Sequence, residues 1–158
     1  MNILQVGLIV VGIYLLGRKP SSSSAFAGKT NAQSPCPAAT QDLKLNTRNR
    51  QRAIDEPWIR YGPLNLSDEG YWTMVAERWN TTPAVAKKSR CANCVAFDIS
   101  PRMQECMPGE VQDKEGRLGY CWMHAFKCHS ARTCLTWAAG GPITTDRVSL
   151  SWQNKGKK

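Results

Sequence analysis

Six of the seven cysteines of this chain lie between Cys91 and Cys134, and this concentration of thiols is its most chemically informative feature. Both histidines, His124 and His129, fall within the same stretch. Thiolates and imidazoles are the protein ligands that zinc and iron–sulfur clusters use, and thiols also pair as disulfides. The stretch therefore predicts a cluster, a zinc ion or a set of disulfides. Its cysteines are Cys91, Cys94, Cys106, Cys121, Cys128 and Cys134.

The first four of these cysteines have a distinctive order. Cys91 and Cys94 form a CxxC pair, which places two thiolates on one tight loop. Cys106 follows after eleven residues, and Cys121 follows after a further fourteen, directly behind a glycine and a tyrosine. This order resembles that of the high-potential iron–sulfur proteins. The resemblance implies that Cys91, Cys94, Cys106 and Cys121 are the ligands of a [4Fe–4S] cluster.

The resemblance is confined to about residues 91–122, and the chain departs from the family in two respects. Tyr120 stands where the family usually has a tryptophan, and Cys128 and Cys134 have no counterpart. Aromatic residues are plentiful nearby and would form the dry surroundings that control a cluster's potential. These aromatic residues are Phe97, Tyr120, Trp122, Phe126 and Trp137.

A zinc site is the main alternative. Cys91-x2-Cys94 and Cys121-x2-His124 form two pairs that suit tetrahedral Zn²⁺, although the 26 residues between them exceed the spacing of most zinc ribbons. This alternative leaves the other three cysteines of the stretch unassigned. The domain would then be a zinc-stabilised interaction module without a redox role.

Disulfides are the third hypothesis, and they would make the chain a secreted, stapled protein. Six cysteines allow 15 connectivities, so the sequence alone does not choose a pairing. Cys128 and Cys134 are interpreted as a local disulfide, a redox pair or two buried thiols. Cys36 lies between Pro35 and Pro37 and is interpreted as an unpaired thiol.

No catalytic constellation is evident, so an enzyme is not the favoured class. A c-type haem requires CxxCH, and Cys94 is followed by Val95. The net charge of +9 lies mainly in the flanks, since residues 91–134 hold five basic and five acidic residues. A nucleic-acid surface would place its basic charge on the folded domain, so nucleic acid is a disfavoured partner.

The N-terminus is apolar from Ile3 to Leu16. As a helix this segment spans roughly 21 Å, which is short of the roughly 30 Å hydrocarbon core of a membrane. Three interpretations remain: a single-span anchor, a signal peptide cut after Ala27, or a helix docked on a partner protein. Basic residues after an anchor would keep the cysteine domain on the cytoplasmic side.

The remaining chain predicts a small α+β domain with little regular structure, stapled by a metal or by disulfides. We divide it into an apolar helix (1–19), a flexible basic linker (20–57), a cysteine-rich metal-binding domain (58–153) and a basic tail (154–158). Helices are expected over residues 65–79, from Thr82-Pro83 and from Ser100-Pro101, and a short strand over residues 148–152. Residues 108–119 are expected to be a surface loop.

A second resemblance concerns the segment from Gly119 to Ile143, which reads GYCWMHAFKCHSARTCLTWAAGGPI. It looks like small cysteine-rich proteins encoded by marine tailed bacteriophages. This resemblance implies a virus-encoded protein that is a structural or accessory part of the virion, or one tethered to the host membrane. Taken together, the sequence predicts a phage iron–sulfur protein whose cluster holds the fold together and carries single electrons.

Overall fold

The structure is a computed structural model that describes residues 35–64, 67–107 and 112–156. The chain divides into two units, residues 1–33 and 34–158, and every described element belongs to the second. This unit is a small α+β fold, which confirms the predicted class. Its helices are α1 (Ala38–Gln41), α2 (Leu43–Asp55), α3 (Glu69–Arg78), α4 (Pro83–Ala86), α5 (Pro101–Glu105) and α6 (Asp146–Lys155), with a 3-10 turn, η1 (Cys91–Asn93). Its strands are β1 (Phe97–Asp98), β2 (Gln112–Asp113), β3 (Gly116–Cys121) and β4 (Phe126–His129).

The sheet is built around β3, and all three other strands pair with it antiparallel. β2 pairs with the beginning of β3, so residues predicted to form a surface loop are in fact the first hairpin of the sheet. β1 and β4 flank the end of β3, where Cys121 lies opposite both Phe97 and Phe126. The end of β3 is therefore surrounded by apolar side chains.

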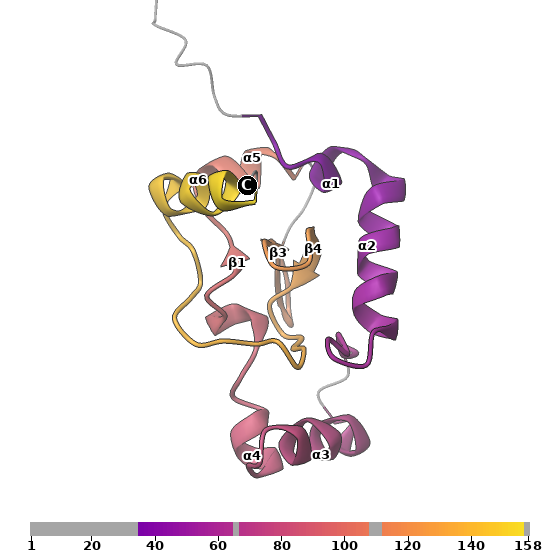
Figure 1. The fold of residues 1–158 in the computed structure, drawn as a ribbon. Coiled ribbons are helices and arrows are strands. Elements are labelled where there is room, and N and C mark those ends of the chain that lie inside the picture. The colour runs from indigo at the N-terminus through magenta and orange to yellow at the C-terminus, as the bar shows by residue number, and fades with distance from the viewer. Residues whose placement is uncertain (1–34, 65–66, 108–111, 157–158) are drawn as a thin grey trace, which may run out of the picture. The chain divides into compact units, whose positions relative to one another are not determined.

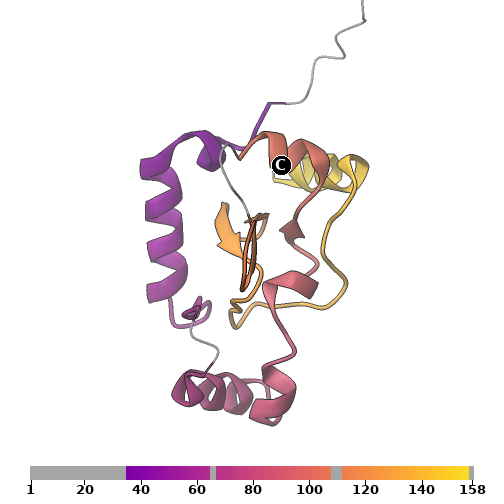
Figure 2. The same cartoon turned by 180° about the vertical axis from the view of Figure 1, so that it is seen from behind.

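Helices lie on both sides of the β3–β4 hairpin. Figures 1 and 2 show α2 on one side, α5 and α6 on the other, and α3 and α4 at one end of the unit. The main core lies between these elements and contains four buried cysteines together with Phe97 and Phe126. Two smaller cores lie under α1 and α5 and between α3 and α4.

Helix α2 occupies part of the segment predicted to be a flexible linker (20–57), so that prediction is wrong for residues 38–55. Asp42 caps the helix by accepting a hydrogen bond from the Leu45 backbone N–H. Polar residues dock the helix on β4 and the turn before it: Asn49 donates to the Ala125 carbonyl, and Asn46 accepts from the Lys127 N–H. Polar docking of this kind leaves no hydrophobic periodicity for sequence analysis to detect.

The helix predicted over residues 65–79 is confirmed as α3, although it begins only at Glu69, and the helices predicted from Thr82-Pro83 and Ser100-Pro101 are confirmed as α4 and α5. The cap of α3 is Asp68, whose carboxylate accepts from the Tyr71 N–H. The Thr82 hydroxyl caps α4, as expected, and proline occupies the first turn of both α4 and α5.

The predicted strand at residues 148–152 is wrong, because this segment lies inside α6. The alternation of apolar residues with serines suggested a strand. In the helix, Ser149 and Gln153 face inward instead, four residues apart, and both bind the buried Arg102 side chain. Because the buried arginine needs hydrogen-bond acceptors, the buried face of this helix carries polar residues where an apolar face would be usual.

A disulfide joins Cys36 to Cys106, 70 residues apart in sequence. The prediction that Cys36 is unpaired is therefore wrong. The residue before it docks on α5 and α6, because the Pro35 carbonyl accepts hydrogen bonds from the Gln153 and Arg102 side chains. The disulfide and these bonds fasten the beginning of the described chain to the domain.

The predicted apolar helix at residues 1–19 lies outside the described residues. Within residues 35–64, 67–107 and 112–156, no helix is both long and apolar enough to cross a bilayer.

Candidate functional site

Five cysteines carry free thiols, and all five lie in or against the main core. Four are buried, and the fifth, Cys121, is partly buried. They come from separate segments that the fold brings together, namely η1, the ends of β3 and β4, and the loop after β4. This gathering of thiols is the strongest candidate site in the molecule. The five are Cys91, Cys94, Cys121, Cys128 and Cys134.

Backbone hydrogen bonds hold the contributing segments side by side. The Cys91 N–H donates to the Arg132 carbonyl at 2.7 Å, which sets η1 against the loop that carries Cys134. The Trp122 N–H donates to the Ala96 carbonyl at 3.0 Å, which brings the end of β3 to the CxxC turn. These backbone hydrogen bonds therefore set the positions of the thiols, and no bond between the sulfurs is needed to bring them together.

Cys128 is at the centre of the group. It lies opposite Gly119 in the β3–β4 ladder, so its side chain shares a face with that of Cys121 two residues further along. Its thiol forms hydrogen bonds with the sulfurs of both Cys121 and Cys91. The bond from Cys128 lowers the pKa of Cys121, while burial raises that of Cys128 well above its ordinary value.

Three of the thiols also receive hydrogen bonds from nearby backbone N–H groups. The donors are Ala138 and Ala96 for Cys94, His124 and Met123 for Cys121, and Thr136 for Cys134. Such N–H···S bonds stabilise a thiolate, and hydrogen bonds to the sulfurs are among the features that tune metal–thiolate centres. The backbone around Cys94, Cys121 and Cys134 therefore favours the thiolate form of each side chain.

Burial has the opposite effect and disfavours the negatively charged thiolate. It raises the pKa of Cys94 and raises the pKa of Cys134 to about 12. No lysine or arginine is among the main influences on the pKa of Cys94, Cys121 or Cys134 from the described residues. Without a bound cation the thiols of Cys94 and Cys134 are mostly neutral, and a metal would supply the compensating positive charge.

His124 lies near the thiols through a shared hydroxyl. The Thr136 Oγ1 is 2.6 Å from His124 Nε2 and 3.2 Å from the Cys134 sulfur. The other ring nitrogen, Nδ1, is buried and has no hydrogen-bond partner. The edge of the ring faces Trp58, with centroids 6.0 Å apart, and burial lowers the pKa of His124. A buried neutral imidazole with an unused nitrogen can act as a ligand.

Two glycines allow the segments around the thiols to approach closely. A Cβ at Gly141 would lie 1.7 Å from the Cys94 carbonyl oxygen. A Cβ at Gly119 would lie 2.5 Å from the Phe97 ring. Neither position tolerates a side chain without displacing the backbone or a core ring that surrounds the thiols.

The structure changes the predicted ligand set at one position. Cys91, Cys94 and Cys121 lie together, but Cys106 lies in a different core and is bonded to Cys36. A disulfide sulfur has no thiolate to donate, so Cys106 is not a ligand in this structure. Cys128 and Cys134 are not disulfide-bonded to each other, and both join the thiol group instead. Sequence analysis did not place Cys128 and Cys134 in this group of thiols, because nothing in their spacing relates them to the CxxC pair.

As positioned, the described side chains do not form a closed metal site. No three or more histidine, cysteine, aspartate or glutamate side chains among them have an arrangement that would hold a single ion. The chemistry of the donors nevertheless fits a thiolate-bound group. A zinc ion needs its ligands to converge on one point, whereas a [4Fe–4S] cluster takes each thiolate at a different iron atom.

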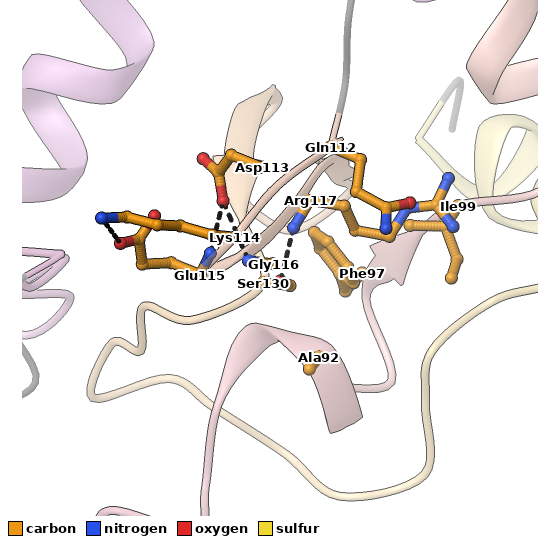
Figure 3. Close-up of a pocket in the computed structure, with 10 residues that line it drawn as sticks. All are labelled: Ala92, Phe97, Ile99, Gln112, Asp113, Lys114, Glu115, Gly116, Arg117 and Ser130. Atoms are coloured by element: carbon orange, nitrogen blue, oxygen red, sulfur yellow. Dashed lines mark hydrogen bonds and ion pairs between the residues drawn. The ribbon is translucent and has the colours of Figure 1, made fainter.

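The largest cavity described lies beside this group, next to the turn between β2 and β3, with a volume of about 510 Å³ (Figure 3). Asp113 organises the turn by accepting from the Glu115 and Gly116 N–H groups, both at 2.9 Å. Figure 3 shows that Arg117 and Gln112 extend together on the far side from Lys114 and Glu115. No cysteine lines this cavity, so it offers no direct path to the thiols.

Comparison with known proteins gave no relatives: no family model, no curated protein and no solved structure matches this chain.

Proposed function

We propose that this chain is a phage-encoded iron–sulfur protein in which a [4Fe–4S] cluster holds the core together and carries single electrons. The observation that supports it best is the N–H···S bonding of Cys94, Cys121 and Cys134 inside one core. Neutral buried thiols gain little from such donors, whereas thiolates bound to iron gain a great deal.

The proposed ligands are Cys91, Cys94, Cys121 and Cys134. The first three agree with the sequence resemblance, and Cys134 takes the place of Cys106. Cys134 is preferred to Cys128 because its sulfur accepts from the Thr136 N–H and shares a hydrogen bond with the Thr136 hydroxyl, whereas Cys128 bonds only to other thiols. Cys128 then remains a thiol that donates to the Cys121 sulfur.

The proposed setting is the virion, as a structural or accessory component. It rests on the resemblance of residues 119–143 to small phage proteins, and the Cys36–Cys106 disulfide supports it. Disulfides persist on virion and cell surfaces and are rare in the reducing cytosol. The disulfide therefore argues against a cysteine domain held on the cytoplasmic side of the host membrane. Residues 1–19 would dock on other virion or membrane proteins.

Zinc is the second candidate, and the unpartnered Nδ1 of His124 is the observation that favours it. The ligands would be Cys91, Cys94, Cys121 and His124, and the protein would be an interaction module without redox activity. A third candidate, a secreted protein stapled by disulfides, is favoured by the Cys36–Cys106 bond alone. Five further cysteines are an odd number and do not all pair within one chain.

The metal and sulfide content of full-length protein purified without oxygen tests these candidates. The iron–sulfur proposal expects about four iron atoms and four acid-labile sulfides per chain, with visible absorption. A colourless protein with one zinc per chain would replace it by the second candidate. Metal-free protein with its remaining cysteines oxidised would replace it by the third.

A further inference from the structure

A second candidate site is a cavity of about 300 Å³ between α2 and α3, which none of the five free cysteines lines. Two arginines, Arg60 and Arg132, line it together with Tyr61, Tyr71 and the backbone at Gly62. None of the described residues that line the cavity is acidic. Among the described residues, neither arginine forms a salt bridge with a carboxylate. The cavity therefore holds two positive charges that the described part of the chain leaves uncompensated.

Arg132 is held in place. Its Nη1 donates to the Gly62 carbonyl at 2.9 Å, and its guanidinium lies 5.4 Å from the centroid of the Tyr61 ring. These two contacts fix the plane of the guanidinium and leave most of its N–H groups for another acceptor. The wall beside it is closely packed, since a Cβ at Gly62 would lie 2.3 Å from the Tyr71 ring.

Arg60 stands in a backbone conformation that arginine rarely adopts. Its φ is 48°, in the left-handed region, where glycine would fit at lower free energy. The Tyr71 hydroxyl donates to its carbonyl at 2.8 Å and so links this turn to α3. Strained residues of this kind gather at ligand sites. Asn80 and Ala125 share the conformation, but neither lines a cavity described here.

The hydroxyl groups of the two tyrosines are already engaged, since that of Tyr71 donates to the Arg60 carbonyl and that of Tyr61 accepts from the His129 N–H. Burial raises the pKa of Tyr61 and of Tyr71 well above the ordinary value, so neither adds negative charge at neutral pH. The cavity thus combines two guanidinium groups with aromatic walls and no negative charge. Planar guanidinium forks match the oxygens of phosphate, which can accept two bonds from each fork.

We propose that the cavity between Arg60 and Arg132 binds a phosphate group, either as the free ion or as the monoester of a small organic molecule. The walls formed by Tyr61 and Tyr71 suit the organic part of an ester. This site goes beyond the proposed iron–sulfur function and does not depend on it.

The test is titration calorimetry of the full-length protein with inorganic phosphate, and separately with a hexose phosphate, at constant ionic strength. Wild type is expected to bind with one site. Arg60→Gly should weaken binding about tenfold or more, because one charge-assisted pair of hydrogen bonds is lost. Glycine suits the positive φ, so this variant should unfold at the same temperature as wild type or higher. Lost binding then cannot be attributed to lost folding.

Two further variants complete the experiment. Arg132→Lys keeps the charge but loses the fork, and it should weaken binding too. Arg48→Gln removes an exposed arginine from α2, outside the cavity, and should leave binding unchanged. Tighter binding of the hexose phosphate than of phosphate identifies an ester as the ligand, and the reverse identifies the free ion. The proposal is overturned if wild type shows no saturable binding, if Arg60→Gly binds as wild type does, or if Arg48→Gln weakens binding equally.

Discussion

The thiol of Cys128 donates a hydrogen bond to the sulfur of Cys121 across the β3–β4 hairpin. The two residues sit diagonally on the same face of the sheet, within the main core. The bond lowers the pKa of Cys121, and the backbone N–H groups of His124 and Met123 lower it further against the effect of burial. Cys121 is therefore the free cysteine best prepared to become a thiolate.

This relationship predicts the reactivity of the metal-free, reduced protein. Cys121 should be alkylated by iodoacetamide at a lower pH than an ordinary thiol, because only the thiolate reacts. Cys128→Ala removes the donor, so the midpoint of the pH profile of Cys121 should rise. Cys128→Ser retains an O–H donor and should keep the midpoint low. Mass spectrometry of the modified peptide gives the rate at each pH, and identical profiles for the alanine and serine variants would contradict the assignment.

The disulfide gives a second prediction. Closing a loop between residues 70 apart restricts the unfolded chain and stabilises the fold by about 4 kcal/mol. Thermal unfolding with and without a reductant should therefore differ strongly in wild type. In the double variant Cys36→Ala/Cys106→Ala, reductant should have no effect through this bond, and the unfolding temperature should match that of the reduced wild type. A wild type indifferent to reductant would show that the bond does not form.

The close packing at Gly141 gives a third prediction. Alanine there would place its Cβ 1.7 Å from the Cys94 carbonyl oxygen, so the CxxC turn and the segment after Trp137 must separate. We expect Gly141→Ala to destabilise the fold by about 3 kcal/mol, at the upper end of overpacking effects. The matched control is Gly70→Ala in α3, where the nearest atom is 3.5 Å away. That variant should be neutral or slightly stabilising, since alanine is the better helix former. Chemical denaturation measures both, and equal stability of the two variants would be the contrary result.

Much of the fold could be predicted from local signals. Helices α3, α4 and α5 were predicted because a capping residue or a helix-starting proline precedes each of them, and these signals act within one turn of the chain. Helices α2 and α6 were missed because long-range polar contacts decide them. Asn46 and Asn49 dock α2, and Ser149 and Gln153 face a buried arginine that lies more than forty residues away.

The candidate site was predicted only in part, because local spacing reveals some of its cysteines and tertiary contacts bring in the others. The CxxC pair and Cys121 were found from spacing, and the structure places them together. Cys106 was misplaced because its partner, Cys36, lies in a stretch whose composition resembled a linker. Cys134 reaches the site only through the pairing of η1 with the loop after β4, a tertiary contact that spacing does not encode.

The central claim is that Cys91, Cys94, Cys121 and Cys134 hold a [4Fe–4S] cluster while Cys106 does not. It is tested most directly by the iron and acid-labile sulfide content of two variants purified without oxygen. Cys134→Ala should lose most of the iron and the visible absorption. The double variant Cys36→Ala/Cys106→Ala should keep about four iron atoms and four sulfides per chain, as wild type does. The claim is contradicted if the double variant loses its iron while Cys134→Ala retains it.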